Sequence, residues 1–241
     1  MNCVAQTLDT GFCCLLGFKY FLQYIGKNII INLYDYIVRG EEILARRSKS
    51  HDKNKVFLMF CAVLGMLLGW IASDNTGIPF VEGVLDSVGI WIFTASLVAA
   101  GSERGPVAVI NNLAFYVCAI LAFALHGMLA GASLGAGFLV YRTVLAALGS
   151  LIGFITWNSS QDQWLGAVSG AVPVSLILAE GFPVIYSRSA VLAFDVVLGV
   201  GLFFVLLKGR EKKLMAFPFI IIFVFALVYF DAFSKLFGGW I

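Results

Sequence analysis

Apolar residues dominate the chain in seven long stretches between Val56 and Phe230, and short polar connections separate the stretches. A helix needs about 20 mostly apolar residues to cross a hydrocarbon core of about 30 Å. The pattern therefore predicts an all-α fold, a polytopic transmembrane helical bundle of about seven spans. The predicted spans are Val56–Ala72, Val84–Ala100, Val107–Met128, Leu134–Trp157, Trp164–Ala179, Ala190–Leu207 and Leu214–Phe230.

The first part of the chain differs, because polar side chains interrupt the apolar run between Phe12 and Arg39. These polar residues recur every three to five positions, which places them in one stripe along a helix. The spacing predicts an amphipathic helix that lies in the membrane interface, with its lysines reaching the headgroups. An eighth span whose polar stripe faces the bundle is the alternative. The stripe consists of Lys19, Gln23, Lys27, Asn28, Asn32, Asp35 and Arg39.

Three parts follow from these patterns. Residues 1–55 form the amphipathic helix and a basic cytoplasmic segment, residues 56–230 form the seven-span bundle, and residues 231–241 form a short outer tail. The basic segment sets the topology, and we also expect it to attract anionic lipid. Its basic residues are Arg46, Arg47, Lys49, Lys53 and Lys55.

Lysines and arginines are distributed unevenly among the connections. With the basic segment in the cytoplasm, eleven of them fall on the cytoplasmic side and only two, Arg188 and Lys235, on the outer side. Cytoplasmic loops carry this excess in membrane proteins, so we expect a multi-pass protein of the plasma membrane with its N-terminus inside and its C-terminus outside. The cytoplasmic residues are Arg39, Arg46, Arg47, Lys49, Lys53, Lys55, Arg104, Lys208, Arg210, Lys212 and Lys213.

The composition argues against several functional classes. The chain is 61% hydrophobic and 12% charged, whereas a soluble domain carries about 25% charged residues. The sequence contains no HExxH, GxSxG, P-loop or GxGxxG motif, so we expect no enzyme activity of these types. With two histidines and no CxxC pair, we expect neither a metal site nor a cofactor. Only the short basic segment would suit nucleic acid, and we expect none to bind.

Small residues recur four positions apart in three predicted spans. The pairs are Gly65 with Gly69, Gly149 with Gly153, and Gly166 with Gly170. This spacing lets two helix backbones approach closely. It predicts tight packing inside the bundle, or a docking face for another membrane subunit or a second copy of the chain.

Four ionisable residues are predicted to converge in the outer half of the bundle. Arg142 lies about 12 Å and Asp195 about 8 Å below the outer ends of their spans, at 1.5 Å per residue. Glu180 and His126 end their spans on the same side. A buried charge costs about 2.5–3.5 kcal/mol in a bilayer and so needs a partner. We expect Arg142 to pair with Asp195, with Glu180 as its second potential partner.

The fifth predicted span is short, rich in glycine and interrupted by Pro173, which predicts a kink. Because it ends in Glu180, it resembles the broken helices that line sites in transporters. Irregular packing without a ligand is the alternative.

The favoured function is an integral membrane transport component that binds a small polar or charged solute. Its outward-facing intramembrane cavity would be lined by Arg142, Glu180, Asp195 and His126. The alternative is a non-catalytic partner subunit for assembly, regulation or immunity, in which Arg142 and Asp195 form a purely structural pair. A third possibility is an intramembrane enzyme that acts on lipid headgroups.

Overall fold

The computed structural model describes residues 50–74, 77–131, 136–161, 163–187 and 189–230, and helices are the only regular elements among them. The residues from Lys53 onward belong to one packing unit. The predicted amphipathic helix, the basic residues Arg46, Arg47 and Lys49, and the outer tail lie outside the described residues.

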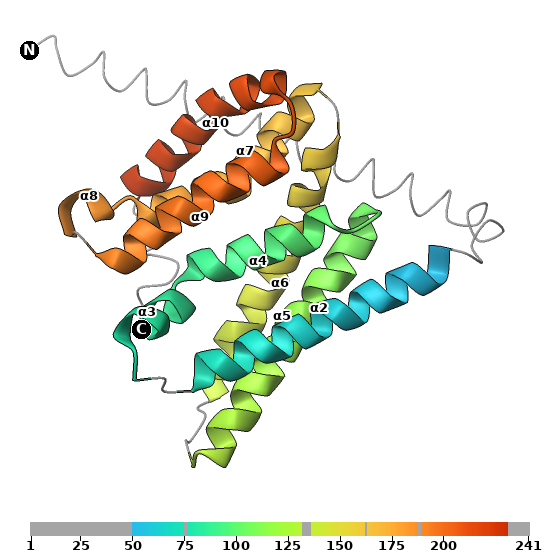
Figure 1. The fold of residues 1–241 in the computed structure, drawn as a ribbon, viewed down its shortest axis with the longest axis vertical. Coiled ribbons are helices and arrows are strands. Elements are labelled where there is room, and N and C mark those ends of the chain that lie inside the picture. Colours follow the sequence, from blue (N-terminus) through green and yellow to red (C-terminus); the bar gives the residue numbers. More distant parts are fainter. Residues whose placement is uncertain (1–49, 75–76, 132–135, 162, 188, 231–241) are drawn as a thin grey trace, which may run out of the picture. The chain divides into compact units, whose positions relative to one another are not determined.

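Six of the predicted spans correspond to single helices (Figure 1). The largest difference is at the first, which begins at Ser50 instead of Val56 and so includes two lysines of the basic segment. The six helices are α2 (Ser50–Ser73), α5 (Gly105–Leu129), α6 (Ala136–Trp157), α7 (Gln163–Gly181), α9 (Ala190–Leu206) and α10 (Arg210–Tyr229). A 3₁₀ turn, η2 (Asn158–Ser160), follows α6, and a short helix, α8 (Val184–Ser187), follows α7.

Length and composition decide which of these helices can cross a membrane. Among the described residues, five helices are long and apolar enough, and a bent helix pair raises the number to six. Helix α9 has 17 residues and is about 26 Å long at 1.5 Å per residue. The structure therefore supports a membrane protein with five to six candidate spans.

The second predicted span is not one continuous helix. It covers the last residues of α3 (Pro79–Asp86) and all of α4 (Val88–Ala100), which meet at a bend of 60°, and α3 begins five residues before the predicted Val84. Ser87 separates them with an extended backbone, and its side chain accepts the N–H of Gly89 at 3.0 Å, as an N-cap does. Proline at the first position of α3 also starts a new helix there, since its missing N–H costs nothing at a helix start.

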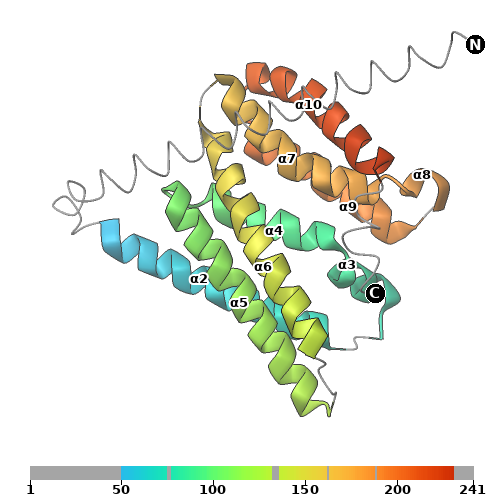
Figure 2. The same cartoon turned by 180° about the vertical axis from the view of Figure 1, so that it is seen from behind.

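Helix α2 packs on α5 through the predicted small-residue pair. A Cβ on Gly65 would overlap the carbonyl of Phe115, and a Cβ on Gly69 would overlap the carbonyl of Ala119. The two glycines thus let two helix backbones touch. The crossing of α2 over α5 can be followed from both sides (Figures 1 and 2).

Helix α7 lies at the centre of the second half of the bundle and packs against α4, α6, α9 and α10. It runs through Pro173 as one helix, and its buried side chains form a core with those of α9 and α10. The buried members of that core are Ile92, Ala167, Ala171, Val174, Ile177, Leu202, Leu206, Leu207, Ala216 and Ile220. Helix α7 is therefore packed on several sides, and its C-terminal end lies near the start of α4.

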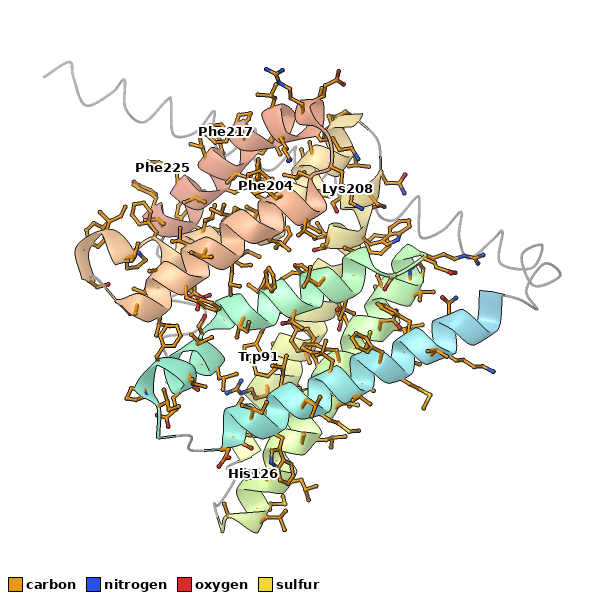
Figure 3. All side chains as sticks on the ribbon, viewed as in Figure 1. Trp91, His126, Phe204, Lys208, Phe217 and Phe225 are labelled. Atoms are coloured by element: carbon orange, nitrogen blue, oxygen red, sulfur yellow. The ribbon has the colours of Figure 1, made fainter. Side chains whose placement is uncertain are left out.

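Large apolar side chains remain exposed on the outside of the helices. Phe204, Phe217 and Phe225 are 59%, 59% and 70% exposed, and they lie on α9 and α10 (Figure 3). A soluble protein rarely exposes large continuous apolar surfaces. This surface is what a bilayer would cover.

Candidate functional site

Three elements that are distant in the sequence meet at the bend between α3 and α4. They are the start of α4, the C-terminal end of α7 and the first turns of α9. Helix α4 packs against both α7 and α9, and α3 packs against α4 and α9. The corner between α3 and α4 lies beside the start of α9 in both views (Figures 1 and 2). Helices α7 and α9 each place one carboxyl group at this corner.

Glu180 is the carboxyl group from α7, one residue before that helix ends. Its Oε1 accepts the backbone N–H of Val88 at 2.7 Å. Val88 is the first residue of α4, so this N–H has no acceptor within its own helix. The helix dipole also favours a negative group at this end. The other oxygen, Oε2, is buried and has no hydrogen-bond partner among the described residues, so only one oxygen of the carboxylate is bound there.

Asp195 is the carboxyl group from α9, and its side chain is 0% exposed. The hydroxyl of Ser87 donates a hydrogen bond to its Oδ1 at 2.8 Å. A Cβ at position 89 would lie 2.5 Å from that oxygen, so Gly89 is what lets the carboxylate approach the cap. Oδ2 is buried without a partner. The same half-satisfied state thus occurs at both carboxyl groups.

The two carboxyl groups converge on one turn of backbone. Glu180 binds Val88 and Asp195 binds Ser87, two neighbouring residues whose Cα atoms are about 3.8 Å apart. The two groups also interact electrostatically. Helices α4, α7 and α9 contain no lysine, arginine or histidine. Two acceptors without a counter-charge are suited to a positively charged or hydrogen-bond-donating species.

Arg142 lies elsewhere. It is on α6, and its guanidinium carbon lies 5.4 Å from the centroid of the Phe123 ring of α5, within the range of about 6 Å for a cation–π contact. Among the described residues, Asp195 is bound by Ser87 and has no ion pair with Arg142. Our expectation of that pair came from depth alone, and α6 directs Arg142 toward α5.

His126 is also separate from the two carboxylates. Its ring lies 4.6 Å from that of Trp70, in an edge-to-face arrangement that joins α5 to α2. It marks the lower end of α5 in Figure 3, away from α9. Of the four predicted residues, the structure brings together Glu180 and Asp195 and places Arg142 and His126 in other contacts.

Sequence reasoning missed two residues of the site, Ser87 and Gly89. The signal was present, because a serine directly before an apolar helical run is a common N-cap. The apolar run from Val84 to Ala100 continues on both sides of Ser87, however, and predicts a single span. Val88 contributes only its backbone, which no side-chain pattern would reveal.

The described residues contain no group of three or more histidine, cysteine, aspartate or glutamate side chains that could hold a metal ion. The Glu180–Asp195 pair supplies two carboxylates and falls short of such a group.

Comparisons with protein-family models, with curated proteins and with solved structures gave no match for this chain. The function therefore has to be argued from the geometry of the pair itself.

Proposed function

We propose that the protein is an integral membrane transport component that binds a small, positively charged solute at the Glu180–Asp195 pair. The observation that carries this proposal is the pair of buried carboxylate oxygens, Oε2 and Oδ2, that have no partner beside a broken helix. The sequence predicted a polar or charged solute. We now propose a cation, because Arg142 and His126 make other contacts and the two groups at the site are both carboxylates.

Energetic cost supports a functional role over a structural one. A charged side chain within a bilayer costs about 2.5–3.5 kcal/mol even on the lenient scale. A structural pair would offset this cost with an opposite charge, but Glu180 and Asp195 carry the same charge, and the described helices α4, α7 and α9 carry no basic residue. A bound cation would supply a positive charge at the pair.

The bend between α3 and α4 gives a second line of support. Non-helical backbone at membrane depth occurs where it is buried in protein or lines a water-filled site. In many transporters, such broken helices place their ends at the substrate. Here the start of α4 lies at the carboxylates and holds both of them through Ser87 and Val88.

The finer topology is part of the proposal. With the α3–α4 pair as one span and α9 as a short seventh span, the count is odd. The N-terminus then lies in the cytoplasm and the C-terminus outside the plasma membrane, in agreement with the excess of cytoplasmic lysines and arginines. In this orientation the Glu180–Asp195 pair lies near the outer side.

The test is a binding measurement with purified protein and three cations: methylammonium, guanidinium and sodium. Asp195→Asn and Glu180→Gln each remove one charge and keep the shape of the side chain. For a cation that the natural protein binds, each variant should weaken binding about tenfold or more, which is about 1.4 kcal/mol. Asp86→Asn is the matched control, because Asp86 is an exposed carboxylate at the end of α3, and binding should change less than about twofold. Equal affinities in all four proteins, or no binding of any of the cations, would exclude the proposal.

The partner-subunit alternative has lost part of its support. Its docking faces were the small-residue pairs, and in the structure these contact elements of the same chain. Gly65 and Gly69 meet α5, Gly149 and Gly153 meet Tyr116 and Asn112 of α5, and Gly166 and Gly170 meet η2 and Leu207.

A further inference from the structure

Three donors at the start of α4 are already engaged in hydrogen bonds. The Ser87 hydroxyl hydrogen goes to Asp195 Oδ1, the Val88 N–H goes to Glu180 Oε1, and the Gly89 N–H goes to the oxygen of Ser87. Among the described residues, Glu180 Oε2 and Asp195 Oδ2 remain as two buried acceptors with no donor. One added proton would give the pair a further donor and remove one of its two negative charges.

We infer that the Glu180–Asp195 pair takes up one proton from the outer aqueous phase and holds it as a carboxyl–carboxylate pair, so that the protein couples solute movement to protons. The outer side and the coupling to solute movement rest on the proposed function and its topology, whereas the proton site itself rests on the geometry of the pair. In chemical terms, a proton from water forms an O–H bond at one carboxyl group, and the pair loses one of its two negative charges. Release to water reverses the step, and no other reactant is needed.

A metal ion fits this position less well than a proton. Calcium takes about 6–8 oxygen ligands and magnesium about six, whereas the pair offers two free oxygens. The third oxygen nearby, that of Ser87, already accepts the N–H of Gly89 and donates its hydrogen to Asp195. Two carboxyl groups that bind neighbouring residues of one cap are sufficient to hold a single proton, because like charges that share a site disfavour double ionisation.

The charged groups around the pair support the same conclusion. Helix α4 contains no ionisable residue with a formal charge, and Glu180 and Asp195 are the only ones on α7 and α9. On α3, Glu82 accepts the N–H of Gly77, and Asp86 is exposed. Helices α6 and α10 also pack on α7. Arg142 of α6 lies over the Phe123 ring, and Lys212 in the first turn of α10 donates to Ser159 of η2, before the start of α7. Among the described residues of α3, α4, α7 and α9, the charges are all negative, which favours a proton at the pair.

The position of the pair gives the proton a mechanical effect. Glu180 ties α7, and Asp195 ties α9, to the cap where α3 and α4 bend by 60°. With one proton, the two carboxyl groups attract each other and hold α7 and α9 on this cap. Without it, two adjacent negative charges repel each other, and a cationic solute can take the place of the proton. Exchange of proton for solute at one site is a direct form of coupling.

The decisive measurement is infrared difference spectroscopy of the full-length protein in lipid vesicles during a pH change. We expect a carbonyl-stretch band of a buried protonated carboxyl group that disappears reversibly at alkaline pH. Both Glu180→Gln and Asp195→Asn should remove or displace this band, and Asp86→Asn should leave it unchanged. If the two variants fail to fold, Ser87→Ala retains both carboxyl groups and should displace the band, because Oδ1 loses its donor.

Three results would overturn the proton site. They are the absence of such a band in the natural protein, a band that neither variant alters, and loss of the band on addition of magnesium or calcium at constant pH. Uptake of guanidinium, which stays charged throughout the usable pH range, under an imposed pH gradient then separates the two proposals, with protein-free vesicles as the control. If the band is present but no uptake occurs, the proton site stands and transport is refuted. If uptake occurs at a rate independent of the pH gradient and no band is present, transport stands and proton coupling is refuted.

Discussion

The close contact between α2 and α5 allows a quantitative test of the fold. An added Cβ at Gly65 would lie 2.9 Å from the carbonyl carbon of Phe115, and one at Gly69 would lie 2.7 Å from that of Ala119. Real Cβ atoms avoid such distances, and backbone atoms cannot rotate away as a side chain can. The variants Gly65→Ala and Gly69→Ala must therefore push the two helices apart.

The size of the effect follows from two opposing terms. Overpacking costs about 1–3 kcal/mol at each position, while replacing glycine by alanine in a helix gains about 1 kcal/mol. Gly201→Ala provides the matched control, because Gly201 lies in α9 with nothing within 4 Å of its added Cβ. The control has the same helical gain without the steric cost. Each α2 variant should therefore be less stable than the control by about 1–3 kcal/mol.

The assay is equilibrium unfolding of the purified protein in mixed micelles, with the free energy of unfolding compared among the three variants and the natural protein. Helix content by circular dichroism before unfolding shows whether each variant starts from a folded state. If Gly65→Ala and Gly69→Ala are as stable as Gly201→Ala, the close approach of α2 to α5 is wrong.

Three further predictions concern the site and the polar interior. Gly89→Ala should displace the carboxylate of Asp195, because its Cβ would lie 2.5 Å from Oδ1. Cation binding should weaken about tenfold, or by about 1.4 kcal/mol. Calorimetric titration would measure the affinity, and unchanged binding would contradict this geometry. Asn112→Leu should raise the free energy of unfolding by about 1 kcal/mol, because both polar atoms of this buried amide lack a hydrogen-bond partner among the described residues. A lower free energy of unfolding in the variant would show that the amide has a bound partner. Arg142→Ala should change the affinity for the cation by less than about twofold. It should lower the free energy of unfolding by about 0.5–2 kcal/mol, because the contact with Phe123 is lost. Loss of cation binding in a folded variant would show that Arg142 belongs to the site.

The sequence by itself determined the class of fold and the course of most helices. Apolar runs of the length of a bilayer can satisfy their backbone only as helices, so the starts of α9 and α5 lie at or near the predicted Ala190 and Val107. The small-residue spacing of Gly65 and Gly69 also predicted a close backbone contact correctly, because only glycine permits that distance.

The break at Ser87 shows where the pattern was insufficient. Hydropathy averages over a whole window and does not register a single capping residue, so the end of α3 and all of α4 were predicted as one span, Val84–Ala100. The local signal for a helix start competes there with an apolar run that continues on both sides. In the structure, α3 and α4 meet at 60° and both pack on α9.

The composition of the site depended on tertiary structure for a related reason. Position along a helix is a property of the sequence, since each residue adds about 1.5 Å, and it correctly placed Glu180 and Asp195 on the same side of the bundle. Which neighbour a side chain meets depends on how each helix is rotated and which helix lies beside it. Packing placed Asp195 against Ser87 and Arg142 against Phe123, because α9 lies against α4 while α6 lies against α5.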